Sequence, residues 1–95
     1  MRELADIRQR IDQIDTQITD LFLERMEAAA DVAEYKRSTG KPVFDRARER
    51  DNVARASARV PENLASYAAV IESVLMEASR EAQYQRLGIK SEPSR

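Results

Sequence analysis

Residues 4–21, with the sequence LADIRQRIDQIDTQITDL, decide the fold of this chain. Their apolar residues are spaced alternately by three and four positions. We call these six residues the apolar seam: Leu4, Ile7, Ile11, Ile14, Ile18 and Leu21. This spacing is typical of a helix that packs lengthwise against another helix.

The seam belongs to a helix of unusual length. No Pro or Gly occurs between the seam and Gly40, so we predict one helix from about residue 3 to about residue 38. Such a helix is about 54 Å long at 1.5 Å per residue. A compact monomer of this size has a radius of gyration of roughly 12 to 13 Å and cannot enclose it. We therefore expect about half of the helix to pack on an outside partner.

A break and a second helix follow. Residues 38–42, with the sequence STGKP, end the first helix, because Gly40 can adopt a positive φ and Pro42 cannot continue a helix. A second helix is expected to begin within residues 43–45 and to end before Pro61. Its apolar content is low, which predicts a helix that covers the core and does not form it.

Pro61 and Glu62 suit the first turn of a third helix, which we expect to continue to about Arg86 and to stop at Gly88. Its apolar residues form one stripe: Leu64, Tyr67, Ile71, Val74, Leu75, Ala78 and Ala82. The polar residues 89–95 read as a loose tail or as the start of a linker.

The composition indicates an all-α protein with one small domain, residues 1–88, followed by the tail. The 95 residues include two Gly, three Pro and 35% charged residues, most of types that favour helix. The absence of Cys and His argues against thiol, imidazole and metal chemistry, and we expect no metal and no cofactor.

The charge and hydropathy patterns limit the classes of binding partner that we expect. A net charge of −1 argues against broad binding to nucleic acid. The sequence has neither a signal-peptide pattern nor a run of about 18 apolar residues, so we expect a cytoplasmic protein without membrane contact.

Two cations lie where the seam continues. Beyond Leu21 the pattern reaches Arg25, at a position suited to an apolar side chain. Lys36, eleven residues farther on, returns to within about 20° of the same face, about 16 Å along the axis. The Arg25 stem could lie along the core with its guanidinium in water or on a carboxylate. The shared face favours a second interpretation, in which two unpaired cations bind one small anion.

Arg8 flanks the seam but lies about 25 Å from Arg25 along one rigid helix, so the two cannot bind one small ligand within a chain. In two copies that run antiparallel about a twofold axis, Arg8 of one copy can face the segment 25–36 of the other. The two helices would cross near residue 19.

A dense group of charges opens the second predicted helix, in the sequence KPVFDRARER. Asp45 is the i,i+3 neighbour of Arg48 and the i,i+4 neighbour of Glu49. Exposed ion pairs of this kind contribute only about 0 to 1 kcal/mol each. We expect Arg48 and Glu49 to face a ligand, and Asp45 to assist them or to cap the helix. Arg46 and Arg50 are expected to face solvent or nearby acids.

Five motifs occur in the order and with the spacing of a known family. They are Ile7-Arg8-x-x-Ile11-Asp12-x-Ile14-Asp15, Leu21-x-x-x-Arg25, Val32-x-x-x-Lys36, Pro42-Val43-x-Asp45-x-x-Arg48-Glu49-Arg50 and Ser79-x-x-x-Gln83. One motif alone is weakly specific, whereas the full series is strongly so. Over residues 4–86 the chain resembles the all-helical class of chorismate mutase, type II.

The resemblance implies an intertwined antiparallel homodimer of three-helix chains that converts chorismate into prephenate, in phenylalanine and tyrosine biosynthesis. This intramolecular Claisen rearrangement requires no nucleophile, metal or proton shuttle. Catalysis must come from holding a flexible dianion in its reactive shape and from stabilising the negative charge that develops as the ether C–O bond breaks.

The resemblance also implies roles for single residues. Lys36 and Gln83 are similar to the pair that hydrogen-bonds the ether oxygen, and Glu49 is similar to the acceptor of the ring hydroxyl. The implied substrate-binding residues are Arg25, Arg48, Ser79 and Arg8 of the second copy for the carboxylates, Asp45 beside Glu49, and Val32 and Met76 for the apolar wall. Guanidinium groups suit carboxylates because their donors match the two oxygens.

Other functions stay open. Isochorismate pyruvate lyase acts on a similar dianion within a similar helical dimer, but the Asp45-x-x-Arg48-Glu49 pattern resembles the mutases better. A non-catalytic dimerisation or regulatory module would have no reason to keep charges in an apolar seam. A DNA-binding helical domain fits worse, since the cations are interleaved with acids.

Overall fold

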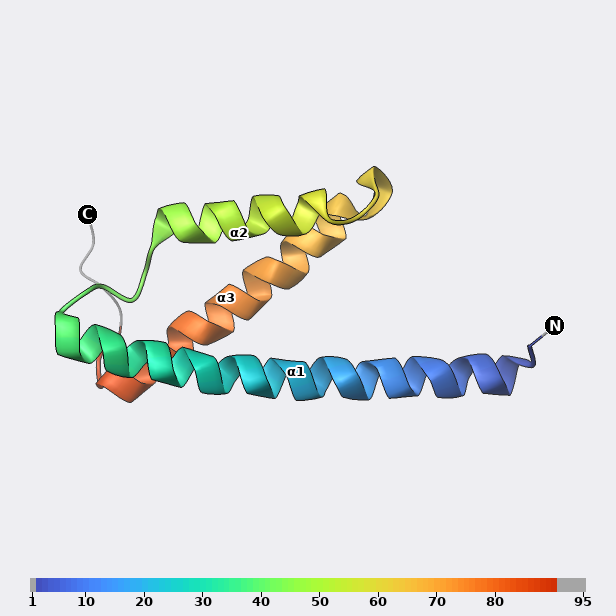
Figure 1. Ribbon diagram of the computed structural model, residues 1–95, viewed down its shortest axis with the longest axis horizontal. Helices are drawn as coiled ribbons and strands as arrows, with labels where there is room; N and C mark the ends of the chain where they lie inside the picture. The colour runs from blue at the N-terminus through green and yellow to red at the C-terminus, as the bar shows by residue number, and fades with distance from the viewer. Residues whose placement is uncertain (1, 91–95) are drawn as a thin grey trace.

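A computed structural model describes residues 2–90, which form helices joined by short loops (Figure 1). Helix α1 spans Leu4–Thr39, α2 spans Arg46–Ala58, the single 3₁₀ turn η1 spans Glu62–Leu64, and α3 spans Ala65–Leu87. The predicted all-α fold with a very long first helix is confirmed, since α1 contains 36 residues.

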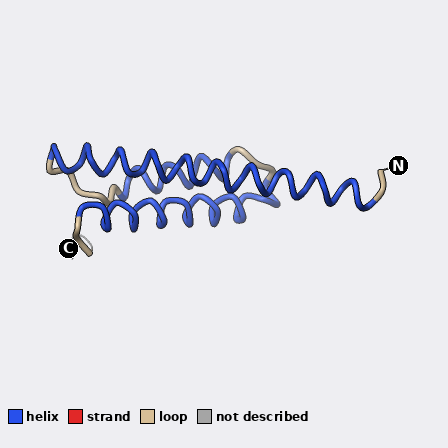
Figure 2. The backbone as a smooth tube through the Cα atoms, turned by 90° about the horizontal axis from the view of Figure 1, so that it is seen from below, coloured by secondary structure: helices blue, strands red, loops and turns tan. Residues whose placement is uncertain are grey.

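Helices α1 and α2 both lie against α3. In Figure 1, α3 runs obliquely between α1 and α2, and Figure 2 shows the same arrangement from below. Within the described part of the chain, α1 and α2 each pack on α3 but not on each other. Helix α3 therefore connects α1 to α2.

The N-terminal end of α1 extends beyond the other helices (Figure 1), and residues 2–21 are all exposed. The chain measures 57 × 26 × 18 Å and has a radius of gyration of 16.8 Å. A compact chain of this length would have a radius of roughly 12 to 13 Å. Because its residues are exposed, the N-terminal half of α1 is not covered within its own chain.

Local backbone chemistry sets two helix boundaries. Gly40, at φ 73°, ends α1 and donates its N–H to the Lys36 carbonyl at 2.8 Å. Helix α2 begins at Arg46, immediately after the predicted range 43–45, because Asp45 is its N-cap. The Asp45 carboxylate accepts a hydrogen bond of 3.1 Å from the backbone N–H of Arg48.

The predicted start of the third helix was wrong by about one turn. Glu62 belongs to η1, and α3 begins only at Ala65. Leu64, the last residue of η1 and the N-cap of α3, has φ −111° and ψ −3°, which differ from ideal α-helical values. The predicted stop at Gly88 agrees with the structure, where this residue has φ 75°. Of the predicted tail, residues 91–95 lie outside the described residues.

The core is small. Its buried apolar residues are Ala29 and Ala33 on α1, Val43 in the following loop, and Met76 and Tyr84 on α3. The two alanines allow α1 and α3 to approach closely. Among the described residues no large side chain is fully buried, so this core alone provides little stabilisation.

Two apolar surfaces stay exposed in the single chain. The residues of the apolar seam are between 40% and 63% exposed. On α3 the predicted stripe does not form the buried face, because Tyr67, Ile71 and Val74 are all exposed while Ser79 and Gln83 are buried. None of the described helices combines the length and hydropathy needed to cross a lipid bilayer.

Candidate active site

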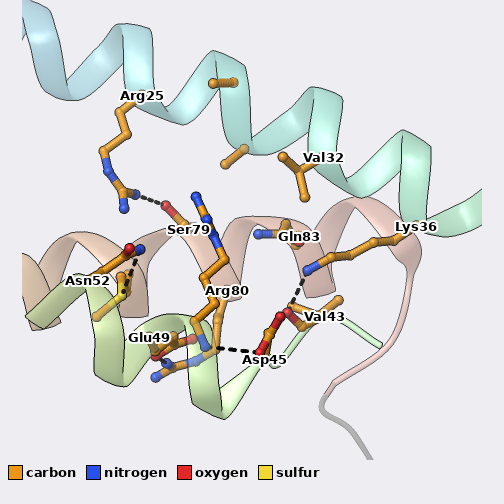
Figure 3. Close-up of a pocket in the computed structure, with 14 residues that line it drawn as sticks. Arg25, Val32, Lys36, Val43, Asp45, Glu49, Asn52, Ser79, Arg80 and Gln83 are labelled. Atoms are coloured by element: carbon orange, nitrogen blue, oxygen red, sulfur yellow. Dashed lines mark hydrogen bonds and ion pairs between the residues drawn. The ribbon is translucent and has the colours of Figure 1, made fainter. Parts of the chain in front are cut away.

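A pocket of about 260 Å³ lies between α1 and α2, with α3 behind it (Figure 3). Each of the three helices contributes polar and apolar side chains to its wall. They are Arg25, Ala28, Ala29, Val32 and Lys36 from α1; Val43 and Asp45 from the loop; Arg48, Glu49 and Asn52 from α2; and Met76, Ser79, Arg80 and Gln83 from α3. A concave site with a few convergent polar groups suits a small metabolite.

All residues that the sequence predicted for the site line this pocket, except Arg8. Arg8 lies on the exposed N-terminal half of α1, about 25 Å from Arg25 along the helix axis. Within one chain it cannot contribute to the pocket.

Arg25 forms one end of the pocket and connects α1 to α3. One guanidinium nitrogen donates to the Leu75 carbonyl at 3.1 Å and to the Ser79 hydroxyl. The other lies 3.5 Å from the Glu72 carboxylate. The prediction that Arg25 is unpaired within its own chain was therefore wrong, because α3 supplies a carboxylate that the periodicity of α1 does not reveal.

Lys36 also has a partner inside the chain. Its ammonium donates a hydrogen bond of 2.6 Å to the carbonyl oxygen of Val43, which is buried. The prediction of an unpaired cation was thus wrong for this residue as well. Figure 3 shows its side chain pointing from α1 into the pocket.

Gln83 brings a buried amide to the pocket wall. The residue is 6% exposed, and its Oε1 atom accepts no hydrogen bond from the described residues. A buried polar atom without a partner costs about 1 to 3 kcal/mol. Such an atom beside a cavity indicates that a ligand or ordered water completes its hydrogen bonding.

The start of α2 separates into two faces. Asp45 caps the helix, as the sequence allowed, and also lines the pocket together with Arg48. The Arg48 guanidinium forms no hydrogen bond or ion pair with a described residue. Arg46 and Arg50 are exposed and line a separate surface hollow beside Phe44, which agrees with the prediction that they face solvent.

Sequence reasoning missed Arg80, Asn52 and Glu72. Arg80 donates to the Glu49 carboxylate. The Asn52 amide lies 3.8 Å from the Met76 sulfur. A signal for Asn52 was available, because it follows Glu49 by three positions on one helix face. No spacing rule predicts the pairing of Arg80 with Glu49, since they lie on different helices.

Comparison with known proteins identifies the family of this chain. The sequence profile of the type II chorismate mutases matches residues 7–84. The chain belongs to this family. The resemblance predicted from the five motifs is confirmed.

Two relatives of known name are similar to this type II chain. A chorismate mutase of Methanocaldococcus jannaschii is 46% identical over 50 residues, which are 53% of this chain and 50% of the relative. The T-protein of Enterobacter agglomerans is 34% identical over 80 residues, which are 84% of this chain and 21% of the relative. The chain thus spans half of the first relative and about a fifth of the second. No solved structure gives a significant match.

The charges of this type II pocket favour an anion. Four cationic side chains line it, namely Arg25, Lys36, Arg48 and Arg80, against the two carboxylates of Asp45 and Glu49. Asp45 is engaged as a helix cap and Glu49 is paired with Arg80. With Glu72, which pairs with Arg25 beside the pocket, four cations face three carboxylates, so a positive charge remains for a ligand that carries carboxylates.

A second ion-pair group joins the C-terminal ends of α1 and α3 outside the pocket. Arg86 donates to the Glu34 carboxylate at 2.8 Å, and Arg37 lies 3.4 Å from the same carboxylate. The hydrogen bond from Arg86, assisted by the charge of Arg37, holds the pKa of Glu34 below its ordinary value of 4.5. Arg37 also donates to the Arg86 carbonyl at 2.8 Å.

Proposed function

We propose that this chain is a chorismate mutase that rearranges chorismate into prephenate. The observation that carries the proposal is a pocket in which cations from all three helices surround the buried amide of Gln83. This arrangement offers fixed donors for a small dianion and for the charge that develops during its rearrangement.

The substrate carboxylates would bind at Arg25 and Arg48, with Ser79 as an additional donor. Arg25 is already oriented by Leu75 and Ser79, so binding costs it little side-chain freedom. Holding both carboxylates selects the folded shape in which the two reacting carbons meet. Val32 and the buried Met76 form the apolar wall for the rest of the molecule.

The Lys36 ammonium and the Gln83 amide would stabilise the transition state. They enter the pocket from α1 and α3, as Figure 3 shows. Both can donate hydrogen bonds to the ether oxygen, on which negative charge accumulates as the C–O bond breaks. The Glu49 carboxylate would accept the hydrogen bond of the ring hydroxyl, with Asp45 beside it.

We further propose an antiparallel homodimer in which Arg8 of the second copy completes each pocket. Two features support it: the exposed apolar seam and the length of α1, which exceeds what one chain covers. The functional domain would span residues 1–88. A twofold arrangement makes both apolar seams cover each other, so the same contact that stabilises the dimer would supply the missing cation.

The direct test follows the loss of chorismate absorbance with purified protein in EDTA, without added cofactor. A rate above the spontaneous rate, with prephenate as the product, is expected. No rate above the spontaneous one would contradict the proposal. A parallel assay with isochorismate distinguishes a mutase from a lyase, because release of pyruvate from isochorismate would identify a lyase.

A further inference from the structure

We propose that Arg80 is a positioning residue of this pocket, which fixes the Glu49 carboxylate at the wall and offsets its charge, so that Glu49 can accept the hydroxyl of a dianionic ligand. The inference rests on the proposed mutase function. Arg80 would act through Glu49 and not by contact with the reacting atoms.

The Arg80–Glu49 pair has a fixed geometry. A guanidinium nitrogen of Arg80 donates to Oε1 of Glu49, and this bond joins α3 to α2. The two side chains are only 28% and 20% exposed, so solvent weakens the pair less than a surface ion pair. The Arg80 guanidinium also lies 5.1 Å from the centre of the Phe44 ring. Arg80 is thus held between a carboxylate and an aromatic ring.

The pair leaves one carboxylate oxygen of Glu49 as an acceptor for the ligand. Arg80 binds Oε1, and no described residue donates to Oε2 of Glu49. A carboxylate oxygen accepts hydrogen bonds, and a ligand hydroxyl is a donor. The pairing therefore orients the carboxylate and leaves one of its oxygens for the ligand.

The charge of Arg80 also reduces the repulsion between Glu49 and an anionic ligand. A carboxylate without a cation beside it would repel a dianion in the same pocket, since like charges at short range destabilise each other. The Arg80 charge cancels that of Glu49, so Arg25, Lys36 and Arg48 can act on the ligand. Glu49 can then supply a hydrogen bond to the hydroxyl with little repulsion of the carboxylates.

A matched control lies on the same helix. Arg86 also pairs with a glutamate of another helix, Glu34, at 2.8 Å, but it does not line the pocket. Arg86→Met therefore removes an interhelical arginine–glutamate pair of α3 without changing the pocket.

The experiment measures kcat and KM on chorismate for the full chain, Arg80→Met, Arg80→Lys, Glu49→Gln, the double variant Glu49→Gln/Arg80→Met, and Arg86→Met. Circular dichroism verifies the fold of each variant.

We expect Arg80→Met to lower kcat/KM by about 10- to 100-fold, the range for one charge-assisted hydrogen bond. In the Glu49→Gln background the same change should cost no more than about twofold, because the two residues act as one unit. Arg80→Lys should recover part of the loss, and Arg86→Met should stay within about twofold of the unchanged chain.

The inference would be overturned if the fold-losses in kcat/KM of the two single variants multiplied in the double variant. It would also be overturned if Arg80→Met kept full activity. An unchanged chain without any mutase activity would instead overturn the proposed function, and this inference with it. If Arg80→Met does not fold, Arg80→Lys measured with and without Glu49→Gln decides by the same criterion.

Discussion

The Lys36 ammonium donates a hydrogen bond of 2.6 Å to the carbonyl oxygen of Val43, and this bond joins α1 to the loop before α2. Val43 is 3% exposed, so its carbonyl lies at the edge of the core. Lys36 also lines the pocket. One side chain therefore supports the loop that carries Asp45 and presents a cation to the ligand.

Replacing Lys36 by Ala should reduce turnover much more than substrate affinity. If the ammonium acts mainly on transition-state charge, kcat should fall by about 100- to 1,000-fold, as with loss of one oxyanion donor. Separate measurement of kcat and KM tests this. Lys41→Ala is the control, because Lys41 lies near the Tyr35 ring and outside the pocket. A variant altered only in KM would refute the role.

With Gln83 in the pocket, we expect an activity that does not require acidic pH, because an amide stays neutral at all relevant pH values. A rate for the unchanged chain that collapsed above about pH 6 would count against its assignment. Gln83→Glu should impose such a collapse, since a carboxyl group donates a hydrogen bond only when protonated. The measurement is kcat/KM against pH. Gln85→Glu, exposed on the same helix, should retain the profile of the unchanged chain.

Mixing two inactive variants tests whether the pocket is shared between copies. In a heterodimer of Arg8→Ala and Arg25→Ala chains, one pocket has both arginines, so random exchange should restore about a quarter of the pockets. The measurement is kcat per chain after the chains are unfolded and refolded together. Arg25→Ala mixed with Arg48→Ala should restore nothing, because both residues belong to the pocket of their own chain. Equal recovery in both mixtures, or in neither, would contradict the shared pocket.

A charge in the apolar seam should weaken association. Ile11 is 50% exposed in the single chain, and its proposed cover is the second copy. Ile11→Glu removes two apolar side chains per dimer, so Kd should rise at least about a hundredfold. Light scattering over a concentration series measures it. Gln9→Glu adds the same charge on the opposite face of α1 and should leave Kd unchanged within about threefold. An unchanged Kd for Ile11→Glu would exclude the seam from the interface.

The stabilising contribution of Glu34 should depend on pH. Its folded-state pKa is below 4.5, so the contribution is present above 4.5 and is lost as the pH falls through the lowered pKa. The difference in Tm between the unchanged chain and Glu34→Gln should therefore shrink in acid. Glu27, which has no ion pair with a described residue, provides the control Glu27→Gln, with little change in Tm. A difference that does not vary with pH would contradict this role.

The sequence alone determined the features that depend on neighbouring residues. The alternating apolar spacing and the absence of Pro and Gly predict α1 almost to its ends, and Gly40 and Gly88 end helices because each adopts a positive φ there. The same periodicity places Arg25 and Lys36 on one face of α1, and the structure shows both in one pocket.

Only the tertiary structure decided which groups meet across helices. Arg25 lies beside Glu72, 47 positions away, and Arg80 pairs with Glu49, 31 positions away. Periodicity gives the direction of a side chain within its own helix but not the distance or angle to another helix. Those depend on how closely α1 and α2 pack on α3, and hence on Ala29, Ala33 and Met76 in the small core. For this reason Arg25, Lys36 and Arg48 could be predicted from the sequence as pocket cations, whereas Arg80 and the partners of these groups could not.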